Sequence, residues 1–393
     1  MKQVPVSIYE VLQFGLGGDS WQQFVDRYEE KYNALTIDGF EFAPTKINYT
    51  FSQLIGSLGV KTLPAYVDPE SPGYEKALKS IQGVSGNIPT QKAFYSLDRV
   101  TVLEKLQLID KFGMEALTPE MQNVFLGMLD EGTDGLIGGY YNSLSHQRMR
   151  VVSTGKFVID ATNNPRGLRG ITLDFGIDAS HFDTLKTTAR WWTAEDHTLA
   201  NEGSASDPIE YIKAKAKEIR KKYHAVIPMH IEISDNLWSD MLGHSKVLAR
   251  IGYSQNVLIA DDTTAVNAGK NLDDIAKKSI IERIVGLPIV VRDSVAYVDK
   301  PDAVSHSLLT VAIPNFDEKN VAFVPDGKIG DIQGVQPLTL GYEPDKVARY
   351  DGGRLVLTQR ANAETHSIYI ESEAAQLCVP SVPQFMFIST VTA

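Results

Sequence analysis

The sequence predicts helices where apolar side chains recur every three or four residues. This spacing covers residues 20–34, 118–150 and 208–223. A capping residue followed by proline, Thr118-Pro119 and Asp207-Pro208, opens the second and third segments and is typical of a helix start. Gly132, Gly135, Gly138 and Gly139 lie close together in the second segment, and each costs about 1 kcal/mol relative to alanine, so we expect that helix to bend or break there.

Short apolar runs bounded by turn residues predict strands. After the second helix they cover 151–160 and 171–177. Beyond residue 224 they alternate with helices and then dominate the tail, in this order: strand 225–234, helix 235–243, strand 256–260, helix 271–285, and strands 288–298, 320–324, 329–333, 354–359, 366–371 and 385–391. The mixture predicts a chain of helices and sheets with its own buried core.

Residues 66–95 follow neither pattern. Six proline and glycine residues interrupt this stretch, and only 74–81 has the composition of a short ordered piece. So long a segment without periodicity is uncommon inside a compact domain, and we interpret it as a functional arm.

Composition narrows the classes of function. The 393 residues carry 38 Lys and Arg against 49 Asp and Glu, a net charge of -11, so we do not expect nucleic acid to be the main ligand. The single cysteine, Cys378, excludes an internal disulfide and a cysteine-based zinc site, which is typical of a reducing compartment. No run approaches the ~18 apolar residues of a membrane span, and we expect neither a membrane segment nor a signal peptide.

Candidate chemistry is sparse. His230 and Glu232 share one face of a predicted strand, and we interpret them as structural residues. A basic row along the third predicted helix, Lys213, Lys217, Arg220 and Lys221, is either a solvated face or a contact for phosphate or an acidic partner. No catalytic constellation is visible, so the sequence predicts a protein that is not an enzyme and needs no cofactor.

Four motifs nevertheless follow one another in a distinctive order. They are Ser145–Phe157, a helix end running into a Thr-Gly-Lys strand; Asp174-Phe175-Gly176 with the later Trp191-Trp192 and Asp207-Pro208; Asn320–Gly341, with its Pro-Asp-Gly turn; and the closing strand Pro380–Ala393. Together they resemble the major capsid proteins of tailed phages, in particular the lambda-like capsid E family, over roughly residues 60–393.

The resemblance implies the α+β capsid fold of the Hong Kong 97 phage type. That fold has an N-terminal arm, an extension loop, a peripheral domain with a long spine helix, and an axial domain. The implied boundaries are 1–60 for the arm, 61–96 for the extension loop, 97–205 for the peripheral domain with its spine helix at 118–150, 206–340 for the axial domain, and 341–393 for the C-terminal strands of the peripheral domain.

The implied function is that of a major capsid protein. Such a chain self-assembles into hexamers and pentamers that form the icosahedral head shell around phage double-stranded DNA, in the virion, after assembly in the host cytoplasm. Its implied partners are further copies of itself, portal, scaffold and decoration proteins, and DNA bound without sequence specificity; no membrane is involved. Two alternatives remain: a nanocompartment shell of the encapsulin type, and an α/β enzyme with a pocket within 206–300.

The extension loop is the segment where we expect contacts between subunits. Tyr74, Leu78 and Ile81 are its apolar anchors, and Lys76 and Lys79 are available for ion pairs across the interface. No partner for these lysines can be assigned, so we expect no covalent cross-link of the kind known in the type member of the fold.

Overall fold

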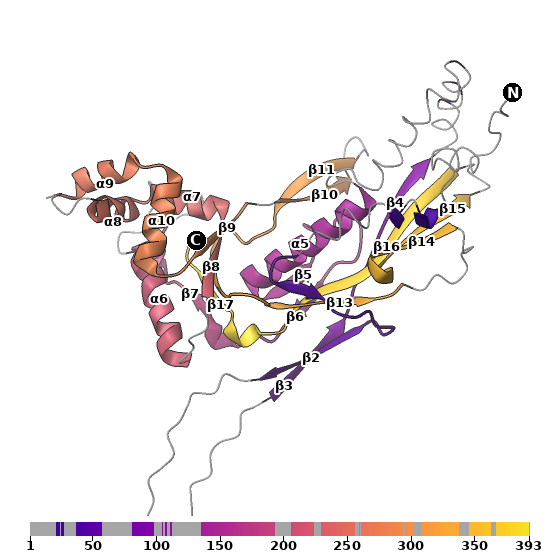
Figure 1. The fold of residues 1–393 in the computed structure, drawn as a ribbon, viewed down its shortest axis with the longest axis horizontal. Coiled ribbons are helices and arrows are strands. Elements are labelled where there is room, and N and C mark those ends of the chain that lie inside the picture. The colour runs from indigo at the N-terminus through magenta and orange to yellow at the C-terminus, as the bar shows by residue number, and fades with distance from the viewer. Residues whose placement is uncertain are drawn as a thin grey trace, which may run out of the picture. The chain divides into compact units, whose positions relative to one another are not determined.

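The chain divides into two compact units, each of which contains its own sheet. Unit 1 comprises residues 1–51, 85–147 and 331–379, and unit 2 comprises 52–84, 148–330 and 380–393. The computed structural model (Figure 1) describes residues 21–23, 25–26, 37–56, 81–97, 104, 107, 111, 135–192, 206–223, 229–255, 259, 261–293, 295–301, 308–337, 346–362 and 367–392.

A six-stranded sheet forms the framework of unit 1. Its strands are β1 (Phe40–Phe42), β4 (Thr90–Leu97), β13 (Gly330–Val335), β14 (Val347–Tyr350), β15 (Leu355–Asn362) and β16 (Ser367–Pro380). The order is β1-β13-β16-β15-β14, and β4 also pairs with β16. The long yellow strand β16 in Figure 1 therefore organises the sheet, because β13, β15 and β4 all pair with it.

The first part of helix α5 (Leu136–Thr154) packs on this sheet. Tyr141 is buried and meets the ring of Tyr350 edge to face, with 6.4 Å between ring centroids. The amide of Cys378 in β16 donates to Gln147 Oε1 at 3.2 Å, and Cys378 is fully buried, as its apolar neighbours in the sequence suggest.

Helix α5 continues further than its sequence predicts. The expected strand from residue 151 was wrong at its start, because Val151 and Val152 lie fully buried within the helix. The helix gives way at Gly155, whose φ of 73° suits glycine, and β5 begins only at Lys156. Residues 118–134 of the predicted helix lie outside the described part of the chain.

Unit 2 is built on a five-stranded sheet of order β7-β17-β12-β8-β9. The strands are β7 (Phe182–Thr184), β8 (Met229–Ser234), β9 (Ile289–Arg292), β12 (Asn320–Pro325) and β17 (Phe387–Thr390), and the helices are α6 (Pro208–Tyr223), α7 (Asp235–Gly243), α8 (Ser245–Gln255), α9 (Asp262–Lys270) and α10 (Asp274–Val285). Buried residues of α6, α7, α8 and α10 join those of the sheet in one hydrophobic core.

Helix α6 follows its sequence prediction closely. Asp207 Oδ1 accepts from the amide of Glu210 at 3.1 Å, which caps the helix where expected. The four apolar residues of its inner face are buried, namely Ile209, Ile212, Ala216 and Ile219.

The described residues also form three two-stranded ribbons and four short 3₁₀ segments. The ribbons are β2 (Thr50–Gly56) with β3 (Ile81–Asn87), β5 (Lys156–Ile159) with β6 (Ile171–Asp174), and β10 (Val295–Pro301) with β11 (Leu308–Pro314). The 3₁₀ segments are Ala179–His181, Thr187–Ala189, Asp351–Gly353 and Pro383–Phe385.

Several local predictions were wrong. The second half of the stretch 66–95, which was expected to lack regular structure, contains β3 and most of β4. Gly86 lies within β3, although glycine is uncommon in strands. A larger residue would not fit there, because its Cβ would lie only 2.6 Å from Cε1 of the Phe51 ring. Helices α8 and α9 were not predicted, and the single strand expected over 288–298 is divided between β9 and β10. The class itself, α+β, is confirmed.

Candidate functional site

The most highly organised polar site in the described residues is a group of five charged side chains in unit 2, here called the Glu232 cluster. Glu232 and His230 stand on β8, Arg148 on α5, Arg292 at the end of β9, and Asp326 in the turn after β12. The shared face predicted for His230 and Glu232 is confirmed, since His230 Nε2 lies 3.1 Å from Glu232 Oε1.

Glu232 is held by two arginines. Arg148 donates through Nη1 and Nη2 to the two carboxylate oxygens, both at 2.5 Å. Arg292 adds bonds from Nε at 3.0 Å and Nη2 at 2.8 Å. Glu232 has no exposed surface and Arg148 is 1% exposed, so both charges depend on this pairing for the stabilisation that water would otherwise supply.

These neighbours decide the charge of Glu232. Burial by itself would raise the pKa of its carboxyl, but the hydrogen bond from His230 and the charge of Arg148 outweigh burial and hold the pKa far below its ordinary value. Glu232 is therefore ionised at every physiological pH.

The geometry also fixes the charge of His230. Its Nδ1 lies 2.6 Å from Asp326 Oδ1, while its Nε2 faces Glu232. Both ring nitrogens must donate to make both bonds, which only the imidazolium ion can do. Burial opposes this charge, but the bonds to Glu232 and Asp326 raise the pKa of His230 above its ordinary value.

The cluster is suited to anchoring the chain rather than to catalysis. The carboxylate of Glu232 already accepts bonds from Arg148, Arg292 and His230 and is sealed from solvent, so it has no free position for a substrate. Among the residues that the structure describes, no group of three or more His, Cys, Asp or Glu side chains is placed to hold a metal ion.

Sequence reasoning missed the two arginines. They come from elements 84 and 60 positions away from Glu232, and nothing in local spacing pairs them with it. The available signal was Glu232 itself, a charged residue between Ile231 and Ile233, both of which are buried in the core. A charge at such a position requires a partner.

The basic row on α6 lies on the surface. Lys213, Lys217, Arg220 and Lys221 are all exposed, opposite the buried stripe of the same helix. Lys215 departs from this row, since its Nζ is 3.1 Å from Asp183 Oδ2. This exposure is compatible with both alternatives, a solvated face and a contact for phosphate or an acidic partner.

The residues expected to make contacts between subunits fall mostly outside the described part of the chain. Tyr74, Lys76, Leu78 and Lys79 lie there, while Ile81 is the first residue of β3. Strand β3 pairs with β2, so paired strands flank residues 57–80 in the sequence. The contacts themselves stay a prediction.

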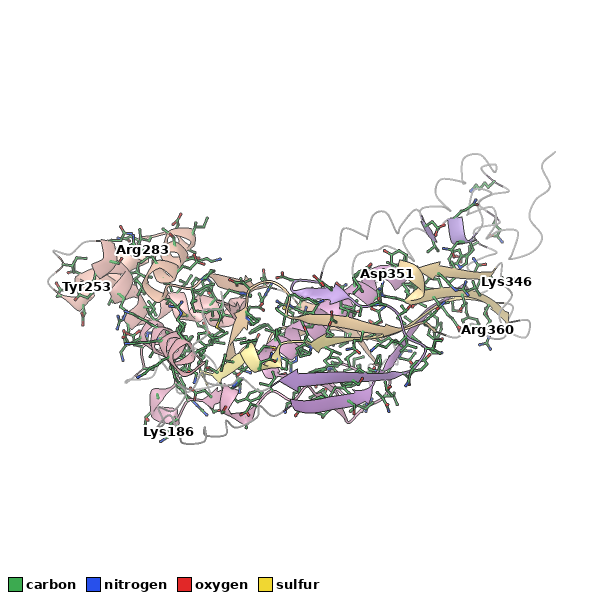
Figure 2. The ribbon with its side chains drawn as sticks, turned by 60° about the horizontal axis from the view of Figure 1, so that its bottom comes forward. Lys186, Tyr253, Arg283, Lys346, Asp351 and Arg360 are labelled. Atoms are coloured by element: carbon green, nitrogen blue, oxygen red, sulfur yellow. The ribbon has the colours of Figure 1, made fainter. Side chains whose placement is uncertain are left out.

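Unit 2 also exposes apolar side chains. Ile275 at the start of α10 is 82% exposed, and Tyr297 of β10 is 50% exposed. In Figure 2, Tyr253 and Arg283 lie at the tip formed by α8, α9 and α10, where the Tyr253 hydroxyl donates to Asp262 Oδ1 at 2.6 Å.

Among the helices in the described ranges, none is long and apolar enough to cross a membrane.

Several solved structures are similar to this chain over most of its length, at low sequence identity. A phage-related protein of Bordetella bronchiseptica RB50 shares 12% identity over 98% of each chain, with a TM-score of 0.41. The capsid of cyanophage P-SCSP1u shares 10% identity over 91% of this chain and 87% of that one, with a TM-score of 0.43. A virus-like particle of Pyrococcus furiosus shares 9% identity over 97% and 96%, with a TM-score of 0.37.

The sequence itself provides the assignment. No curated protein matches it, but the family described as phage major capsid protein E matches residues 59–391. This interval covers nearly all of the segment over which the four sequence motifs resemble tailed-phage capsid proteins. The chain belongs to the phage major capsid protein E family.

Proposed function

We propose that this capsid protein self-assembles into hexamers and pentamers, which close into an icosahedral head shell around phage double-stranded DNA. The observation that carries the proposal is the family match over residues 59–391. The net charge of -11 is compatible with this role, because a shell encloses DNA mostly without gripping it.

The proposed organisation is that of the Hong Kong 97 type. Residues 1–60 would be the arm and 61–96 the extension loop, with the axial domain over 206–340 and the peripheral domain over 97–205 and 341–393. Two features support it. Helices α6 to α10 and strands β8 and β9, which build most of the unit 2 core, fall within the proposed axial domain. Helix α5 lies largely within the proposed spine, 118–150.

The extension loop is proposed as the clamp between subunits. Its anchors are Tyr74, Leu78 and Ile81, because apolar burial outweighs surface ion pairs, which contribute about 0–1 kcal/mol each. Lys76 and Lys79 would add such pairs. We further propose that the chain catalyses no reaction and that portal, scaffold and decoration proteins join it in the virion, after assembly in the host cytoplasm.

Electron microscopy of the purified full chain tests the proposal. We expect closed shells, or capsomer rings, at high protein concentration. A chain that stays monomeric at every concentration would contradict the proposed function.

A paired substitution then tests the clamp. Tyr74→Ser with Leu78→Ser should leave the circular dichroism spectrum unchanged and abolish closed shells. Ile47→Ser with Leu168→Ser is the control, since these apolar residues are exposed and lie outside the loop. Normal shells from the loop variant would contradict the clamp alone.

A further inference from the structure

Helix α6 presents three lysines to solvent in a single row. Lys213, Lys217 and Lys221 are exposed and follow one another at intervals of four residues. We propose that this row binds the phosphate backbone of a double-stranded nucleic acid without reading its sequence. The inference rests on the proposed function, in which the shell encloses such a polyanion.

The row is fixed in place by the rest of the helix. The opposite face of α6 is buried in the core of unit 2, and Asp207 caps its first turn. Lysines on an anchored helix keep their spacing when a ligand arrives, so binding need not order the backbone that carries them.

The three lysines have no carboxylate partner among the described residues, although α6 contains acids. Glu210 pairs with Arg250 at 2.8 Å, and Glu218 pairs with Lys215 at 3.3 Å. The acids of α6 therefore form ion pairs with other residues. The row of three lysines remains a local concentration of positive charge on a chain of net charge -11.

Helix stability alone does not account for the row. Like charges four residues apart on a helix repel each other. The helix dipole favours cations near the C-terminus, which explains Lys221 but not Lys213 or Lys217 in the middle of the helix. An anion lying along the row would remove the repulsion.

Some of the carboxylates that a second copy of this chain would offer are already paired within that copy. Many described acids of unit 2 already have a partner in their own subunit, namely Asp183 with Lys215, Asp207 with Arg250, Asp262 with Tyr253, Asp274 with Lys277 and Asp326 with His230. A duplex, in contrast, carries one phosphate charge per about 1.7 Å of its axis. Lysine contacts phosphate as a point charge and conveys no sequence information, so binding should be independent of sequence.

Salt dependence tests the inference on the full chain. The variant Lys213→Gln, Lys217→Gln, Lys221→Gln is compared with Lys186→Gln, Lys270→Gln, Lys300→Gln, which removes three exposed lysines elsewhere in unit 2. Fluorescence anisotropy with a labelled duplex of about 30 base pairs gives the affinity from 50 to 200 mM salt. Three phosphate contacts contribute a slope near 2.7 in log affinity against log salt, or about 40-fold over this range. The α6 variant should lose that factor, and the control should keep it.

Each remaining outcome decides against the inference. Equal salt slopes in the two variants would refute it, as would a strong preference for one duplex sequence. Tighter binding to poly-glutamate than to duplex would identify an acidic protein surface as the partner instead. Microscopy of the wild-type chain separates the two proposals: if shells form but the slopes are equal, only the inference fails, and if no shell forms, the proposed function fails independently.

Discussion

Removing the charge of Glu232 while keeping its shape is the sharpest test of what holds unit 2 together. Glu232→Gln leaves the backbone and side-chain volume nearly unchanged but removes the carboxylate charge to which Arg148 and Arg292 both donate. One carboxylate oxygen becomes an amide N–H₂ that faces the guanidinium N–H groups, so hydrogen bonds are lost along with the charge.

The expected cost follows from burial. The side chain of Arg292 is 13% exposed and can recover some hydration, whereas that of Arg148 is 2% exposed and cannot. Breaking a buried ion pair by removing one partner typically costs about 3–5 kcal/mol. That is a large part of the 5–15 kcal/mol by which proteins are usually stable, so we expect unit 2 to unfold at a much lower denaturant concentration.

Urea unfolding of the full chain, followed by tryptophan fluorescence, provides the measurement, because Trp191, Trp192 and Trp238 belong to the core of unit 2. The control is Asp274→Asn, which removes the exposed carboxylate of the pair with Lys277 and should cost about 0–1 kcal/mol.

A second substitution keeps the reasoning testable if Glu232→Gln does not fold. Arg148→Met should be milder, because Glu232 then retains Arg292 and His230. The anchor role of Glu232 would be refuted by a loss below 1 kcal/mol for Glu232→Gln, or by a larger loss for Arg148→Met than for Glu232→Gln.

Three further predictions concern close packing, pH and covalent state. Gly252→Ala and Gly269→Ala should each destabilise the α8–α9 pair, although alanine favours helices. The reason is that the new Cβ would clash with a backbone oxygen of the other helix, that of Ala265 or Leu248. Thermal unfolding that shows stabilisation would contradict this. The pKa of His230 is raised on folding, so its contribution to stability is complete below the ordinary pKa of about 6.5 and is lost as pH rises through the folded-state pKa. The urea midpoint of the wild-type chain should therefore fall between pH 6 and pH 9, and His230→Gln should flatten this fall. Assembled particles boiled in detergent should run as one band near 43.4 kDa, and a ladder of multimers would disprove the absence of cross-links.

The sequence predicted those elements whose signals are local. Helix α6 begins at its Asp-Pro cap and buries the stripe that its spacing indicates, and α10 ends at Gly286, which takes a φ of 74°. In both cases the residues that determine the boundary lie within one turn of it, so no distant contact is needed to read them.

The failures share a different cause. Val151 and Val152 have high strand propensity, yet both are buried as part of α5, where tertiary packing overrides the preference. The pair α8–α9 was not predicted, because nothing in the local sequence shows which backbone each of its glycines meets. In the structure they let two backbones meet, with Gly252 against Ala265 and Gly269 against Leu248.

The Glu232 cluster shows where local reading must stop and what can replace it. The side-chain alternation of β8 predicted that His230 and Glu232 share a face, but it could not identify Arg148 and Arg292, which arrive from α5 and β9. A general rule would have gone one step further: a carboxylate between two core isoleucines is too costly to bury alone, so cations must reach it from elsewhere in the fold. The same rule read in reverse applies to α6, where the fold supplies no anion to Lys213 and Lys217 among the described residues. The ion pairs that folding completes around Glu232 are an anchor, whereas the row that folding leaves open on α6 is the surface that we propose for a partner.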